Sequence, residues 1–113
     1  MPTTPRPAPL NTFTAVMEWC PALADIGTLV VVVRARDDVD ARNRILAVLG
    51  ASYGYDPAFR EVSDDPSEWA MVGAMFRGDL AERLVSPGDH EVIRDGDVSD
   101  EALAAARRRF RLG

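Results

Sequence analysis

Apolar and polar residues along the chain follow two different periods, which predict both strands and helices. The segment Thr28–Ala35 contains four consecutive valines without polar alternation. Because β-branched side chains suit a pleated surface and missing alternation indicates burial on both faces, we predict a central strand here. Alternating apolar residues also favour a strand over Thr12–Trp19, although a helical spacing fits the same segment.

Two further segments carry the start and stop signals of helices. An aspartate can cap a helix predicted over residues 38–50, which Gly50 or Gly54 can end in a left-handed conformation. Ser99 can cap another helix over residues 99–111, with acidic residues in its first turn and arginines in its last. Both charge placements suit the helix dipole.

Residues 66–85 are predicted to form a third helix. Asp65 can cap it, and Pro66 suits its first position. Its apolar residues recur at spacings of 3, 4, 4 and 4, namely at Trp69, Val72, Phe76, Leu80 and Leu84. These spacings are typical of one helical face, and a strand from Trp69 to Phe76 is the alternative.

These elements predict an α+β fold, in which a small sheet around residues 28–35 packs with about three helices. A short strand is expected at His90–Arg94. At 113 residues the chain has the length of one domain, which we place at residues 12–113. Residues 1–11 contain four prolines and are expected to form an extended arm.

The composition excludes several classes of chemistry. All 13 basic residues are arginines, so neither a Schiff-base lysine nor a P-loop lysine is present. A single cysteine and a single histidine exclude a zinc finger, a multi-histidine metal centre and an intrachain disulfide. We therefore expect no cofactor and, from the lone cysteine, a cytoplasmic location. No membrane span is expected, because no apolar run approaches about 20 residues.

Charge and residue usage narrow the choice of partners. The formal net charge is −5, and an acidic body disfavours binding to nucleic-acid phosphates. Four arginines near the end of the chain could nevertheless contact an acidic partner, or simply compensate the end of a helix; they are Arg107, Arg108, Arg109 and Arg111. Frequent Ala, Arg, Asp, Val and Gly without Lys suggests a GC-rich genome, such as that of an actinobacterium or its phage.

Gly50-Ala51-Ser52-Tyr53-Gly54 matches the Gly-x-Ser-x-Gly pattern of serine hydrolases. In those enzymes a strand precedes the serine and a helix follows it. Here a predicted helix precedes the motif instead. We therefore interpret the two glycines as part of a helix end.

One group of residues has the composition of a metal site, namely Asp89, His90, Glu91 and Asp95. An imidazole with several carboxylates can hold a hard divalent ion. The competing interpretation is a solvated acidic turn that precedes the last helix. A small metal-dependent enzyme or ligand-binding domain is therefore the alternative function.

The preferred hypothesis is a non-enzymatic adaptor or assembly protein, which binds a protein partner or its own copy. Met71 and Met75 would give the predicted helix 66–85 a second apolar face, and flexible methionines suit an adaptable contact surface. Burial of that face in the core is the alternative. The candidate partner-binding residues are Trp69, Met71, Met75, Phe76, Arg107, Arg108, Arg109 and Arg111.

Overall fold

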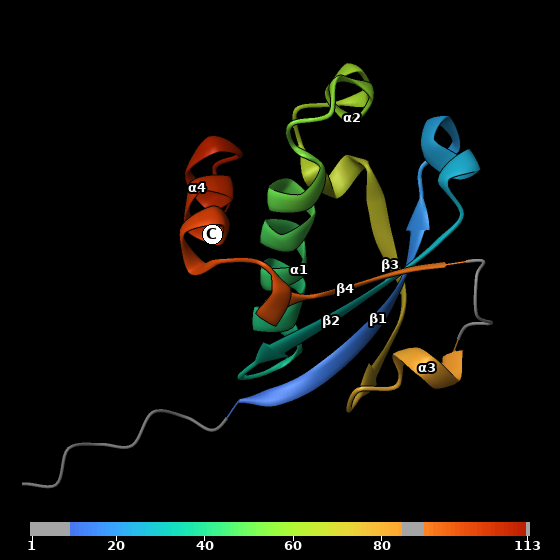
Figure 1. The fold of residues 1–113 in the computed structure, drawn as a ribbon, viewed down its shortest axis with the longest axis vertical. Helices are drawn as coiled ribbons and strands as arrows, with labels where there is room; N and C mark the ends of the chain where they lie inside the picture. Colours follow the sequence, from blue (N-terminus) through green and yellow to red (C-terminus); the bar gives the residue numbers. More distant parts are fainter. Residues whose placement is uncertain (1–9, 85–89, 113) are drawn as a thin grey trace, which may run out of the picture.

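Four strands form one mixed sheet in the order β3-β1-β2-β4 (Figure 1). This is a computed structural model, and it describes residues 10–84 and 90–112. The strands are β1 (Asn11–Trp19), β2 (Thr28–Ala35), β3 (Ala70–Arg77) and β4 (His90–Arg94). β1 pairs antiparallel with both β2 and β3, whereas β4 runs parallel to β2. The predicted α+β class and the strands expected in β1, β2 and β4 are confirmed.

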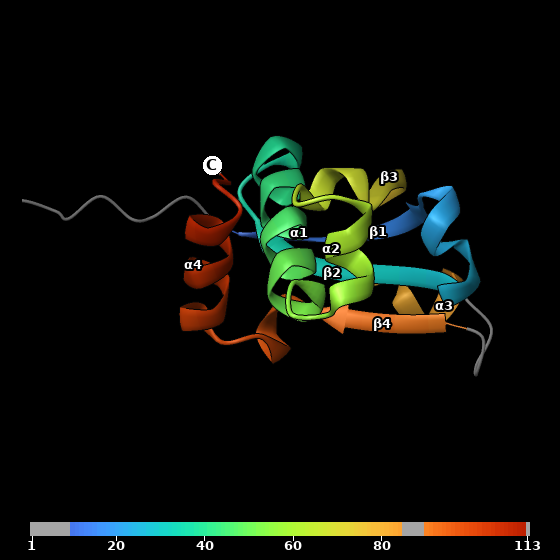
Figure 2. The ribbon, with the colours of Figure 1, turned by 90° about the horizontal axis from the view of Figure 1, so that it is seen from above.

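Helices cover both faces of this sheet, although unequally (Figures 1 and 2). They are α1 (Asp38–Tyr53), α2 (Pro57–Val62), α3 (Ala81–Leu84) and α4 (Asp100–Arg109). α1, α2 and α4 lie on one face, where α4 packs against α1, and the four-residue α3 lies under the opposite face. Short 3₁₀ turns occupy Pro21–Ile26, Pro66–Glu68 and Asp95–Asp97.

β2 is the central strand, and its valines are buried on both faces as predicted. Val31 and Val33 belong to the main core beneath α1, together with Leu29. Val30 and Val32 point the other way and pack against Ala81 of α3. The absence of polar alternation in Thr28–Ala35 is therefore explained by burial of both faces of β2.

The described part of the helix predicted over residues 66–85, which is residues 66–84, does not form that helix. A single 3₁₀ turn at Pro66–Glu68 leads into β3, which was the alternative interpretation. The β1–β3 register shifts between Val16 and Met17, so that β3 contains one extra residue, Gly73. This bulge interrupts strict alternation and produces apolar spacings that resemble those of a helix.

The helix predicted over residues 38–50 continues to Tyr53, and Gly54 ends it with a φ of −65°, not a left-handed one. Both glycines of the Gly-x-Ser-x-Gly pattern instead make room for the ring of Phe110. A Cβ added at Gly50 would lie 2.9 Å from Phe110 Cδ2, and one at Gly54 would lie 2.8 Å from its Cζ. α4, capped by Ser99 as predicted, carries that ring onto α1.

Residues 1–9 of the proline-rich arm lie outside the described residues, and Asn11, its last predicted residue, begins β1.

We predict that Gly50→Ala lowers the free energy of unfolding by about 1 kcal/mol. Overpacking against the ring of Phe110 costs about 1–3 kcal/mol, and the better helix propensity of alanine offsets up to about 1 kcal/mol of this. In a Phe110→Ala background the clash with the ring is absent and only the contact with Ala106 Cβ at 3.3 Å remains, so the same substitution is expected to destabilise clearly less. Urea unfolding of the four variants measures the coupling, and an identical effect in both backgrounds would contradict the proposed packing.

Candidate functional site

β3 is an edge strand that leaves large apolar side chains uncovered. Among the described residues, β1 is the only strand that pairs with it. Met71 is 64% exposed and Phe76 is 39% exposed, and both lie on the sheet face opposite α1. Exposed apolar edge strands are templates for pairing with another chain.

The hydrogen bonds between β3 and β1 determine which backbone groups of β3 remain unpaired. Gly78 N–H donates to Thr12 O, and Cys20 N–H donates to Trp69 O, each at 2.8 Å. Because antiparallel ladders alternate between bonded and non-bonded pairs, counting inward from both ends shows which residues face away from β1. The backbone N–H and C=O groups that point outward are those of residues 70, 72, 75 and 77.

The bulge at Gly73 sets this uneven spacing. A Cβ added to Gly73 would lie 3.1 Å from Glu18 Cγ and 3.3 Å from Val16 O, so a larger residue would crowd β1. The extra residue separates the outward groups of residues 72 and 75 by three positions, not two. Along the free edge of β3, the outward groups before the bulge (residues 70 and 72) and those after it (residues 75 and 77) therefore do not follow a single two-residue repeat.

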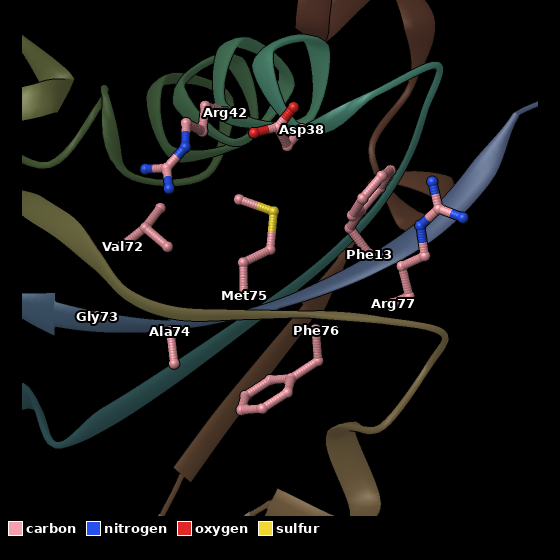
Figure 3. Close-up of a pocket in the computed structure, with 9 residues that line it drawn as sticks. All are labelled: Phe13, Asp38, Arg42, Val72, Gly73, Ala74, Met75, Phe76 and Arg77. Carbon is pink, nitrogen blue, oxygen red and sulfur yellow. The ribbon is translucent and has the colours of Figure 1, made fainter.

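An open groove of about 360 Å³ runs between β3 and the N-terminal half of α1 (Figure 3). Val72 and Met75 point into it toward the helix, whereas Phe76 points away. Asp38 and Arg42 of α1 form its opposite side. The groove gives a strand that pairs with β3 an apolar floor and charged groups along one wall.

The charges around the groove are available for a partner. Among the described residues, Asp38 and Arg42 make no ion pair within the chain. Arg77 lies with its guanidinium carbon 5.8 Å from the centre of the Phe13 ring. Nearby Asp40 is already engaged, because the backbone N–H of Arg36 donates to it and lowers its pKa.

The C-terminal end of β3 is fixed by a buried threonine. Thr14 Oγ1 donates to Gly78 O at 2.6 Å and accepts from Leu80 N–H at 3.0 Å. Gly78 has a φ of 94°, a conformation that favours glycine. Asp79 then accepts from Arg94 of β4, and this hydrogen bond holds the pKa of Asp79 below its ordinary value. The edge strand is therefore anchored at its turn.

The predicted partner-binding residues do not share one surface. Trp69 is fully buried and donates its indole N–H to Ser63 O, so it belongs to the core. Met71 and Phe76 are exposed, whereas Met75 is half-buried beside α1. Arg107, Arg108 and Arg109 form the last turn of α4 and Arg111 follows it, and α4 packs on a different side of α1 from β3 (Figure 1). Arg109 lies over the ring of Tyr55.

The candidate metal cluster is not assembled from the residues that the structure describes. Asp89 and the side chain of His90 lie outside them. Asp95 is buried and accepts from Arg44 Nε at 2.7 Å and from Arg34 N–H at 3.0 Å. Asp95 is therefore occupied in joining α1 to the end of β2.

Glu91 is also engaged, because its carboxylate accepts from the hydroxyl of Tyr53 at 2.8 Å. Within residues 10–84 and 90–112, no group of three potential metal ligands occurs. This leaves Glu91 and Asp95 in separate structural contacts.

No family model, curated protein or solved structure matches this chain. No helix of the described residues has the length and apolar character that crossing a membrane requires.

Sequence reasoning missed the outward backbone groups of β3 and the contribution of α1 to the groove. Both depend on the order of strands, which joins residues 11–19 to residues 70–77. The glycine at position 73 and the flanking Pro66 and Gly78 were the local signals for a bulged strand.

We predict that Asp95→Ala lowers the free energy of unfolding by about 3 kcal/mol, because it leaves Arg44 without its partner in a largely buried site. Asp97→Ala, at an exposed carboxylate two residues away, should change stability by less than about 0.5 kcal/mol. Urea unfolding measures both. Equal effects would show that Asp95 has no special structural role.

We also predict that alkaline pH destabilises the fold through Tyr53. Burial, reinforced by the hydrogen bond to Glu91, raises the pKa of its phenol. A raised pKa means that the stabilisation is complete below the ordinary value of about 10 and is lost as the pH rises through the folded value. Since the chain contains no lysine, few other groups titrate there.

Urea midpoints between neutral and alkaline pH measure this loss, in a Cys20→Ser background that removes the thiol. Tyr53→Phe should flatten the alkaline decline, whereas Tyr55→Phe, at a side chain that is 75% exposed, should retain it. The same decline in both variants would exclude Tyr53 as its source.

Proposed function

We propose that this chain is a non-enzymatic protein-interaction protein, which binds an extended segment of another polypeptide along β3. The observation that carries the proposal is the combination of outward backbone groups on β3 with the exposed Met71 and Phe76. Strand addition uses main-chain hydrogen bonds for affinity and pockets for alternate side chains for specificity. β3 offers both, because its free edge borders a groove.

The groove defines the chemistry of the bound segment. Side chains that point toward α1 would contact Val72 and Met75, with Asp38 and Arg42 within the same groove. Side chains that point to the other face would meet Met71 and Phe76. A segment with apolar residues on both faces therefore fits best, because both halves of this surface are apolar.

This mechanism differs from the one expected from the sequence in its geometry. Met71 and Phe76 contact the partner from a strand, with no apolar helix involved. The partner consequently makes backbone hydrogen bonds that a helical surface could not provide. The C-terminal arginines are not required.

The test is selection of random ten-residue peptides on the immobilised chain. We expect selected peptides to be rich in apolar and β-branched residues, and to shift the backbone NMR signals of the half of β3 around Val72 and of the first half of α1. Val72→Pro should weaken binding about tenfold or more, because it removes an outward N–H that makes no bond to β1.

Val72→Ala is the matched control, because it shortens the same side chain and keeps the N–H. It should bind within a few-fold of the wild type. Circular dichroism confirms that both variants fold. Peptides that bind the proline variant equally well, or that shift only signals of α4, would overturn the proposal.

A further inference from the structure

We infer that the segment bound by β3 is the β3 strand of a second copy of this chain. The two copies are related by a two-fold axis that passes between Gly73 and Ala74. This inference rests on the proposed strand addition and names its occupant. Three features of the described residues support it: the phase of the backbone groups, the order of the side chains and the placement of two charges.

The bulge at Gly73 restricts which strands can form hydrogen bonds along the full length of the free edge of β3. The outward groups of β3 belong to residues 70, 72, 75 and 77, with a three-residue step in the middle. A regular strand presents its groups at every second residue, so it matches only one half of this edge. A second β3 carries the same irregular step. In the antiparallel register that places residue 72 opposite residue 75, all four outward positions find partners.

The same register brings compatible side chains together. Met71 lies opposite Phe76 of the second copy on one face, and Val72 lies opposite Met75 on the other. A methionine sulfur beside an aromatic ring is a favourable contact. Arg77 lies opposite Ala70, so no charge faces a like charge within the ladder. Each contact occurs twice because the axis repeats it.

The groove charges are also complementary under this symmetry. Arg42 lies over Val72, and Asp38 lies toward Met75 and Phe13 (Figure 3). Since Val72 of one copy is opposite Met75 of the other, Arg42 faces toward Asp38 of the second copy. Neither group has an ion-pair partner among the described residues of its own chain. In the dimer the four charges, two from each copy, therefore form two facing pairs.

The register is tested by disulfide trapping in a Cys20→Ser background. Residues 71 and 76 of the two copies form a non-hydrogen-bonded pair, with Cα atoms about 4.5 Å apart. That separation lies within the range of about 4.4–6.8 Å that a disulfide spans. Met71→Cys and Phe76→Cys are purified separately, mixed in a glutathione redox buffer, and examined by intact mass and non-reducing electrophoresis.

We expect a covalent dimer when the two variants are mixed, and little or none from either variant alone. In the proposed register two copies of residue 71 are five positions apart along the strands, about 16 Å, which no disulfide can bridge. Equal cross-linking of one variant with itself would overturn the register. No cross-linking in the mixture would overturn the pairing.

Sedimentation equilibrium provides a measurement that needs no cysteine. The wild-type chain should sediment as a dimer, and Phe76→Glu should raise the dissociation constant on the order of a hundredfold, because the buried charge enters the interface twice. Tyr55→Glu places the same charge at an exposed aromatic residue away from β3 and should leave the dimer intact. A monomeric wild-type chain would overturn the second copy as occupant. If that monomer still selected peptides through Val72, the proposed function would stand.

Discussion

Burial of β2 on both faces is the constraint from which the arrangement of the other elements follows. Val31 and Val33 are buried on one face of the sheet, and Val30 and Val32 on the other. Each face must be covered by another element, because apolar side chains stabilise the folded state only when they are removed from water. α1 and α4 supply a full layer on one side. The four-residue α3 supplies a small one on the other. On that side, α3 covers the centre of the sheet but leaves Met71 and Phe76 of β3 exposed.

The parts of the fold that were predicted correctly are those with local causes. Consecutive valines marked β2, an aspartate cap marked the start of α1, and Ser99 marked the start of α4. The error at residues 66–85 also has a local cause. The bulge at Gly73 changes the period of β3 partway along, so its apolar residues matched a helical stripe better than strict alternation.

The candidate site was only partly predictable, because exposure depends on contacts between distant segments. The sequence placed Met71 and Phe76 on an uncovered apolar surface, and both are exposed, although on a strand. It placed Trp69 there as well, but Phe59 and Phe110 enclose that ring. The metal hypothesis did not anticipate that Arg44, the seventh residue of α1, reaches Asp95. Such pairings follow from tertiary packing and leave no local pattern.

The two edges of the sheet differ in a way that would limit the proposed assembly through β3 to two copies. β4 is five residues long and carries Glu91 and Arg94, which are engaged with Tyr53 and Asp79. Short, charged edges resist further strand pairing. β3 is longer and apolar, but its bulge rejects regular strands over its full length. In the proposed dimer, the two β3 edges would pair with each other, and only β4 would remain at the ends of the combined sheet. In the proposed dimer, the bulge that disfavours full-length pairing of β3 with regular strands would also favour a partner with an identical irregularity.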